Sequence, residues 1–406
     1  MTAEPIVFTG IGVVTPLGTG KEKFWKGLIE GSNAIREITA FDTSRHRTHR
    51  GGEALDFDFA SSCPDLARDR MGRGSQFAVV ASREALNDGG LDAAAIEPTR
   101  IGLTLGTAMG ESPLTEQITD RMIEGQYAAL SEDLVSNAVP DSMAGNAARA
   151  LGLRGPVSLL YNACAGGNYA IGHAADLLTV GAVDYILAGG TDPRSRIGFT
   201  GFNSMLAVAP EKCQPFDRNR RGMCPAEGCA VFLLERLSTA RRRGARIYAV
   251  LAGFGASNDA YHMTSPHPQA RGAVRALRLA LAQAHVDGGE IDYISAHGTG
   301  TLMNDKTETL AMKQVLGDAA YRIPMSSIKS MIGHTMGASS AIEAAACLLA
   351  MERSVIPPTI NYETPDPECD LDYVPNAARD KRVDIAVSNA YALGGHCSSI
   401  VLRKEA

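Results

Sequence analysis

Short apolar segments alternate with helical patterns along almost the whole chain, and this alternation constrains the fold more than any other feature. Strands alternating with helices build layers around a parallel or mixed sheet, so we expect an α/β protein. Val274, Leu277 and Leu281 would form one buried helical face. The predicted strands are 6–14, 101–105, 157–160, 185–188, 230–234, 247–251, 291–296 and 385–388, and the predicted helices are 75–87, 168–178, 272–285, 306–316 and 338–351.

A weak internal repeat suggests a duplicated architecture. The opening VFTGIGVV, a strand that ends in Gly-x-Gly, recurs as VLAGFGAS near residue 253. Two such matches could arise by chance, so both explanations stay open at this point. The polar segments 56–74 and 112–146 are predicted to be irregular cap or interface regions, and Asp305 with Glu308 resembles a capping pair that opens a helix.

Composition excludes several classes of protein. The 406 residues include 39 basic and 45 acidic side chains, a formal net charge of -6, which argues against a protein that coats nucleic acid. The longest apolar segment, 341–351, contains Glu343 and is too short for a membrane span. The N-terminus lacks the basic region of a signal peptide, so we expect a cytoplasmic protein. Eight cysteines without a CxxC pair predict no zinc framework.

Cys164 has the surroundings of a reactive cysteine. An extended run ends at Tyr161, a glycine-containing turn holds Cys164, and a helical pattern follows. At a helix N-terminus, backbone N–H groups and the helix dipole would favour the thiolate, lower the pKa of the thiol and hold an oxyanion. The alternative is a buried, inert cysteine, as we expect for Cys229 and Cys347.

Two histidines lie on other glycine-broken loops. His297 follows a predicted strand, where open α/β sheets meet their ligands, and Thr299 and Thr301 add hydroxyl groups to its loop. The alternative for His297 is a side chain that only satisfies backbone groups. His334 precedes the last predicted helix and shares its loop with Lys329.

Glu343 interrupts the otherwise apolar helix 338–351. A buried carboxylate is costly unless it is paired, so we expect Lys329 as its partner, although the pair could be scaffolding alone. One activated cysteine and two histidines suit acyl transfer through a thioester, followed by carbanion chemistry. Two imidazole N–H donors would stabilise the enolate that forms when a malonyl unit loses carbon dioxide. No metal or organic cofactor would be needed.

These motifs strongly resemble those of the β-ketoacyl-acyl carrier protein synthases, condensing enzymes of the thiolase superfamily, and most closely the elongating type I/II group. The resemblance covers essentially the whole chain, through IVFTGIGVVTPLG, NACAGG, GGTD, PFDRNRRGMCPAEGCAVFLLE, HGTGTLMNDKTET, SIKSMIGHTMGAS and VSNAYALGG. It implies a thiolase-like fold, with two α/β halves in five α-β-α-β-α layers. The halves would be 1–250, which carries the cysteine and cap or dimer insertions, and 251–406, which carries both histidines.

The resemblance also implies individual roles. Cys164 would be the acyl-accepting nucleophile, and His297 with His334 would support decarboxylation. Lys329 and Glu343 match the lysine and carboxylate beside them. The other matched positions are the oxyanion-hole N–H groups of Cys164 and Leu393, the hydroxyls of Thr299 and Thr301 that would hold the phosphopantetheine arm, and Met109 and Tyr391 among the substrate-binding residues.

Three departures from the family pattern favour a specialised polyketide or polyene pathway over housekeeping fatty acid synthesis. Leu393 replaces the gating phenylalanine, Arg221 stands where aspartate is common, and Met109 lies where the family sets the depth of the acyl pocket. In such pathways an active ketosynthase often pairs with an inactive chain-length subunit. The resemblance therefore implies either a homodimer or a heterodimer.

The partner implied by the resemblance is an acidic acyl carrier protein, which needs a basic docking patch. Two candidate patches are Arg68, Arg70 and Arg73, and Arg218, Arg220 and Arg221. Two other functions stay open. A non-catalytic chain-length or scaffold subunit would usually lack the reactive cysteine, and a degradative thiolase would use Cys397 as a second catalytic cysteine.

Overall fold

Ten strands form one continuous path in the computed structural model, which describes residues 4–67 and 71–405. From the centre outward, the first half contains β1 (Ile6–Thr15), β8 (Gly228–Arg236), β7 (Tyr185–Asp192), β5 (Ile101–Gly106) and β6 (Val157–Leu160). The second half contains β9 (Ala249–Asn258), β15 (His396–Arg403), β14 (Ile385–Tyr391), β10 (Tyr293–Ser295) and β11 (Met325–Ser326). The halves join where β1 pairs with β9 over two residue pairs.

The two halves repeat the same pattern of strand directions. In each half the first three strands are antiparallel, and the last three run parallel. The two Gly-x-Gly segments of the sequence lie on β1 and β9, which occupy corresponding places. The repeat therefore reflects a duplicated architecture rather than chance. The boundary expected between residues 250 and 251 stays a proposal, and it lies two residues inside β9, which begins at Ala249.

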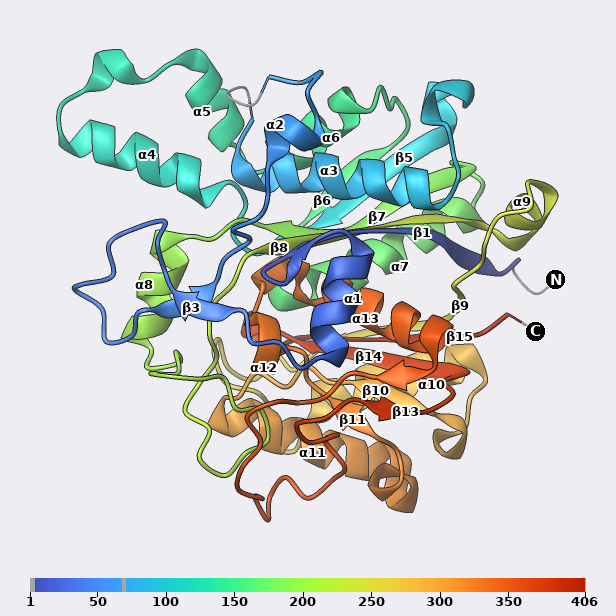
Figure 1. Cartoon of the computed structure of the whole chain (residues 1–406). Coiled ribbons are helices and arrows are strands. Elements are labelled where there is room, and N and C mark those ends of the chain that lie inside the picture. The colour runs from blue at the N-terminus through green and yellow to red at the C-terminus, as the bar shows by residue number, and fades with distance from the viewer. Residues whose placement is uncertain (1–3, 68–70, 406) are drawn as a thin grey trace.

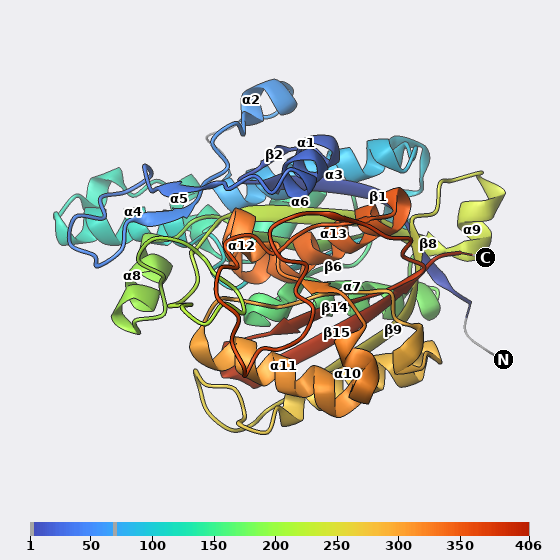
Figure 2. The ribbon, with the colours of Figure 1, turned by 60° about the horizontal axis from the view of Figure 1, so that its bottom comes forward.

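Helices complete five layers (Figures 1 and 2). α3 (Arg73–Asp88) and α6 (Ser142–Ala150) cover the outer face of the first half, while α10 (Arg271–Ala284) and α11 (Leu302–Leu316) cover the outer face of the second. Between the two sets of strands lie α7 (Gly166–Thr179) and α13 (Ser339–Arg353). The predicted α-β-α-β-α arrangement is confirmed.

The two central helices touch at a glycine. A Cβ atom on Gly167 would lie 2.5 Å from the backbone nitrogen of Ala341, so no larger residue fits there without a backbone shift. All of α13 from Ser339 to Met351 is buried, as expected for a helix that is apolar on every side. This contact brings the N-terminal ends of both helices, and the loops before them, to one place.

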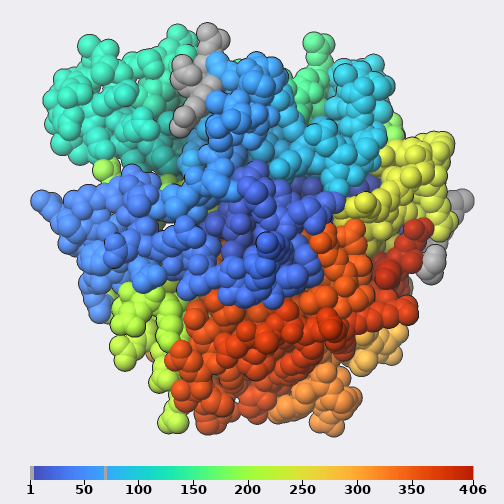
Figure 3. Space-filling model, viewed as in Figure 1, coloured from blue at the N-terminus to red at the C-terminus, as the bar shows by residue number. Residues whose placement is uncertain are grey.

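The remaining elements border this core. They are α1 (Lys21–Ile29), α2 (Phe59–Ser62), α4 (Ser112–Ile123), α5 (Glu132–Ala138), α8 (Arg196–Ser204), α9 (Leu237–Arg242), α12 (Lys329–Ile332), and the short strands β2 (Gly18–Thr19), β3 (Ile35–Glu37), β4 (Arg50–Gly52), β12 (Val355–Ile356) and β13 (Arg379–Asp380). In Figure 3 the N-terminal segments lie directly against the C-terminal residues, so both halves form one body. Within the described residues, no helix is long and apolar enough to cross a membrane.

Every predicted strand and helix corresponds to an observed element, but three expectations were wrong. The segment 112–146 is mostly helical rather than irregular, because α4 and α5 pack on each other and need no broad apolar stripe. Part of 56–74 is helical as well, in α2 and the start of α3. Asp305 and Glu308 do not open a helix, because α11 begins earlier, at Leu302.

Candidate active site

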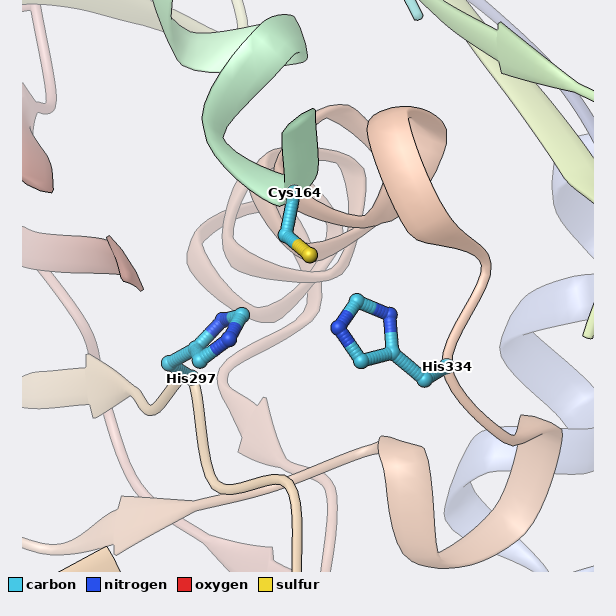
Figure 4. A group of neighbouring side chains, drawn as sticks. All are labelled: Cys164, His297 and His334. Carbon is cyan, nitrogen blue, oxygen red and sulfur yellow. The ribbon is translucent and has the colours of Figure 1, made fainter. Parts of the chain in front are cut away.

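Three buried side chains from separate loops converge between the two halves. Cys164 precedes α7, His297 follows β10, and His334 lies between α12 and α13 (Figure 4). One donor atom from each lies within 4.8 Å of the other two. The two imidazole rings meet edge to face, with their centroids 5.4 Å apart. The structure thus brings together the cysteine and both histidines selected from the sequence.

A strained turn positions the thiol. Ala163 has φ +46°, which is unfavourable for a residue with a Cβ, and Cys164 follows it in the 3-10 helix η5 (Ala163–Ala165). Its sulfur points toward the two rings. Leu393 likewise begins a 3-10 helix, η9 (Leu393–Gly395). The first N–H groups of a helix have no acceptor within it, so both backbone N–H groups suit an oxyanion.

The expected lowering of the Cys164 pKa is wrong for this structure. Burial raises the pKa of the thiol to about 12, and the nearby Lys329 ammonium only partly opposes that effect. Desolvation of the charged sulfur outweighs the favourable position at a helix start. The resting Cys164 side chain is therefore a neutral thiol, which would have to lose its proton to act as a nucleophile.

Hydrogen bonds fix the protonation of both imidazoles. Nδ1 of His334 accepts the N–H of Met336 at 3.1 Å, and Nδ1 of His297 lies 3.3 Å from Nζ of Lys329. A neutral ring with an accepting Nδ1 carries its proton on Nε2. Burial, followed by the Lys329 charge, lowers the pKa of each histidine well below its usual value. Both rings therefore present N–H donors.

Lys329 and Glu343 form the buried ion pair expected from the sequence. Nζ of Lys329 donates to Oε1 of Glu343 and to the backbone oxygen of His297, the latter at 2.6 Å. Burial raises the pKa of Glu343 to about 7, against the opposing effect of Lys329. The cysteine and two histidines are also ligands that zinc accepts, but this ammonium beside His297 would repel a cation.

Two carboxylates that sequence reasoning assigned to a helix start support the His297 loop instead. Glu308 accepts the N–H groups of His297 and Gly298, both at 2.8 Å. Asp305 accepts the N–H of Gly300 at 3.2 Å. The signal for this role was present in HGTGTLMND, since acidic residues follow a glycine-rich loop that has several unpaired N–H groups.

Asp192 is a third supporting carboxylate that sequence reasoning missed. It accepts the hydroxyl of Thr107 and the N–H groups of Ala108 and Met109, at 2.5, 2.9 and 3.0 Å. It also accepts the N–H of Gly337, three residues beyond His334, at 2.5 Å. Burial raises the pKa of Asp192 to about 6. The carboxylate therefore joins the loop of Met109 to that of His334.

The predicted substrate-binding residues surround this cluster in different ways. The hydroxyls of Thr299 and Thr301 lie 2.9 Å apart on the loop beyond His297. The ring centroid of Tyr391 lies 5.9 Å from that of His297, and its hydroxyl has no partner in residues 4–67 or 71–405. The Met109 side chain packs against α8 near Gly198.

The predicted docking arginines are not a free patch. Arg68 and Arg70 lie outside the described residues. Arg73 donates to Glu227 at 2.8 Å and lies over the ring of Phe77, so its charge is already satisfied. In the second predicted patch, Arg220 is buried and paired with Asp366. The remaining members of that patch, Arg218 and Arg221, are exposed.

Known proteins match the whole chain. Models of the N-terminal and C-terminal domains of β-ketoacyl synthases match residues 3–240 and 248–363. A ketoacyl synthase alpha subunit of the tetracenomycin polyketide synthase from Streptomyces glaucescens is 44% identical, over 98% of this chain and 97% of its own length. A 3-oxoacyl-[acyl-carrier-protein] synthase 2 from Synechocystis is 39% identical over 98% of both chains. The solved ishigamide ketosynthase/chain length factor covers 100% of both chains with a TM-score of 0.96 and 38% identity.

Proposed function

We propose that this chain, which belongs to the β-ketoacyl synthase family, condenses an acyl group held on Cys164 with a malonyl unit carried by an acyl carrier protein. One observation carries the proposal: the donor atoms of Cys164, His297 and His334 lie within 4.8 Å of one another. A nucleophile and two N–H donors at that spacing can act on a single thioester.

In the first half-reaction, Sγ of Cys164 attacks the carbonyl carbon of an acyl thioester. The developing oxyanion accepts the backbone N–H groups of Cys164 and Leu393. The carbon–sulfur bond to the pantetheine arm then breaks, and the departing sulfur takes up the proton that the Cys164 thiol loses. The acyl group then remains on Cys164, and the free carrier thiol leaves.

In the second half-reaction, the Nε2–H groups of His297 and His334 donate to the thioester oxygen of the malonyl unit. The bond to its carboxylate breaks, carbon dioxide leaves, and the electron pair forms an enolate held by those donors. The enolate carbon attacks the acyl carbonyl on Cys164, the carbon–sulfur bond to the cysteine breaks, and the departing thiolate takes up a proton from water to restore the thiol. The product is a β-ketoacyl thioester on the carrier. No cofactor beyond the carrier's phosphopantetheine takes part in this scheme, and Thr299 with Thr301 would hold that arm.

A specialised polyketide pathway is the better-supported setting. The tetracenomycin relative belongs to a polyketide synthase, the ishigamide structure is that of a ketosynthase/chain length factor, and Leu393 and Arg221 depart from the usual family pattern. β6 is an edge strand with Val157 exposed, which suits pairing with a second subunit, either a copy of this chain or a chain-length factor. A cytoplasmic location stays a prediction.

Two alternatives fit the site less well. A non-catalytic chain-length subunit would not need Cys164 and two converging histidines. A degradative thiolase would need Cys397 beside Cys164, yet Cys397 lies outside the cluster and its sulfur donates to the Gly395 oxygen at 3.5 Å.

The test is acylation followed by intact-mass measurement. The native protein should gain one acyl group from an acyl-loaded carrier protein and should release carbon dioxide from malonyl carrier protein. Cys164→Ala should lose acylation by at least about a thousandfold while its circular dichroism and melting temperature stay unchanged. Acylation that persists in this variant would exclude the assigned nucleophile, and a native protein that forms no acyl-enzyme would favour the non-catalytic subunit.

A further inference from the structure

Two buried cysteines pack together beside the catalytic loops. Cys213 and Cys224 are both fully buried and form a four-residue apolar cluster with Ile35 and Ala209. We infer that these two thiols are an oxidation site, which a peroxide converts to a disulfide that reversibly lowers the activity of the protein. The disulfide itself does not depend on the proposed function, whereas its effect on activity rests on that function.

The backbone brings the two thiols to the same place. The N–H of Met223 donates to the oxygen of Ala207 at 2.9 Å, and the N–H of Ala209 donates to the oxygen of Met223 at 2.8 Å. The segments that lead to the two cysteines therefore lie side by side. Beyond this pairing the chain turns back, so that the backbone N–H of Cys224 is directed at the sulfur of Cys213.

The ten residues between the cysteines are held firmly by the rest of the protein. Asp217 accepts the N–H groups of Glu363 and Thr364, both at 2.6 Å. Arg220 pairs with Asp366. A short segment that is fixed in this way keeps its two ends near each other, so a bond between the sulfurs costs little additional chain entropy.

The oxidation balances with hydrogen peroxide as the two-electron oxidant. The sulfur of one thiol attacks an oxygen of the peroxide, the O–O bond breaks, and the thiol proton leaves with the departing oxygen as water. The product is a sulfenic acid. The second sulfur then displaces the hydroxyl group, which leaves with the second thiol proton as another water molecule. Two thiols and one peroxide thus give one disulfide and two waters.

Burial makes this reaction slow but does not prevent it. Burial raises the pKa of Cys224 to about 12 and raises the pKa of Cys213 well above its ordinary value, so both react from the neutral thiol. Cys213 lies two residues after exposed Glu211, and Cys224 lies three residues after exposed Arg221. A local opening of these surface segments would admit a molecule as small as peroxide. The site should therefore respond to sustained rather than brief oxidation.

Each cysteine is attached to a loop of the candidate active site. The sulfur of Cys213 donates to the backbone oxygen of Thr299 at 3.5 Å, and the backbone oxygen of Cys224 accepts the N–H of His334 at 2.7 Å. Because bonded sulfurs lie only about 2 Å apart, a disulfide would draw Cys213 toward Cys224 and remove its S–H donor from Thr299. The bond would therefore displace the loop of Thr299, the loop of His334 or both.

The experiment treats the reduced native protein with hydrogen peroxide. Its intact mass should fall by the mass of two hydrogen atoms, and trypsin should release two peptides joined through Cys213 and Cys224. Carbon dioxide release from malonyl carrier protein should slow by about tenfold or more, because displacements of about an ångström at reacting groups have effects of this size. Dithiothreitol should restore both the mass and the rate.

Two variants separate this site from the other thiols. Cys213→Ser keeps a donor opposite the oxygen of Thr299, so its reduced form should keep the native rate within about twofold. Peroxide should neither join its peptides nor slow it reversibly. Cys229→Ala removes another buried cysteine, which lies on β8 outside the four-residue cluster. This variant should respond to peroxide as the native protein does.

Three results would overturn the inference. Native protein that yields no joined peptides after peroxide would exclude the disulfide, and joined peptides without slower carbon dioxide release would exclude its effect on activity. If Cys213→Ser lost as much activity as the native protein, oxidation of another thiol such as Cys164 would explain the loss. Failure of the proposed function looks different, because the reduced native protein would then release no carbon dioxide while the joined peptides would still form.

Discussion

The two central helices begin with the same backbone geometry, but the turns before them contribute different groups to the site. α7 follows Ala163, with φ +46°, through the 3-10 helix η5, and α13 follows Met336, with φ +52°, through the 3-10 helix η8 (Met336–Ala338). Cys164 occupies one turn, and Gly337 occupies the same place in the other. The N–H of Gly337 donates to Asp192, whereas the equivalent turn in the first half directs the thiol of Cys164 toward His297 and His334 (Figure 4). The two halves thus contain similar turns, but only the turn of the first half places a thiol beside the two imidazoles.

The halves also contribute different groups to the site. The first half contributes a thiol whose charged form is disfavoured by burial, while the second contributes the Lys329 and Glu343 pair beside two neutral imidazoles. Burial thus holds the thiol of one half and the two imidazoles of the other in their neutral forms, and the pairing of the halves brings these different groups within a few ångströms. The following predictions test this division of groups between the two halves.

The largest expected effect concerns the donors of the second half. His334→Ala removes one of two N–H donors to the enolate oxygen, so carbon dioxide release from malonyl carrier protein should fall by about 10² to 10³-fold. Acylation of Cys164, which depends on the turn of the first half, should fall by less than about tenfold. Release of labelled carbon dioxide and intact mass measure the two steps. Equal losses in both would mean that the halves do not divide the reaction.

The next effect concerns the buried ion pair. Lys329→Met leaves Glu343 buried without its partner, so the free energy of unfolding should fall by about 3 to 5 kcal/mol. The double variant Lys329→Met/Glu343→Leu removes both charges and should lose much less. Urea denaturation of the two variants checks this. A double variant as unstable as the single one would contradict the role given to the pair.

A smaller effect is expected at Asp192, whose carboxylate connects a loop of the first half to a loop of the second. Asp192→Asn places an amide donor opposite backbone N–H groups, which should shift the loops of Met109 and His334 and lower kcat about tenfold. The matched control is Asp184→Asn at the opposite end of β7, where the carboxylate is 37% exposed and pairs with Arg100. The control should keep kcat within about twofold. Equal losses of kcat in the two variants would argue against a specific role of Asp192 in positioning the loops of Met109 and His334.

The smallest effect concerns pH. Because both histidines have pKa values well below the usual 6.5, neither should gain a proton between pH 6 and 8, and the ¹⁵N NMR signals of both imidazoles should stay those of a neutral ring. The unfolded chain does bind protons near pH 6.5, so these two groups make the free energy of unfolding fall as the pH drops below that value. Imidazole ¹⁵N signals that shift through pH 6.5 would show a charged ring and contradict this prediction.

Much of the site could be predicted because it depends on local sequence. Cys164, His297 and His334 each lie on a glycine-rich loop beside a predicted strand or helix, and short-range pattern was enough to select them. The pairing of Lys329 with Glu343 followed from the cost of an unpaired carboxylate inside an apolar helix. The Gly-x-Gly repeat raised the question of duplication but could not answer it, since strand pairing joins residues far apart in the chain.

The tertiary structure alone decided three things. It assigned Glu308 to the His297 loop rather than to a helix start, it paired Arg73 with Glu227 instead of leaving it exposed, and it raised the pKa of Cys164 rather than lowering it. In each case the outcome depends on which distant groups approach and how much water they exclude. The sequence by itself determined which residues could react, and packing determined their charge and their partners, because desolvation and hydrogen bonding depend on neighbours in space.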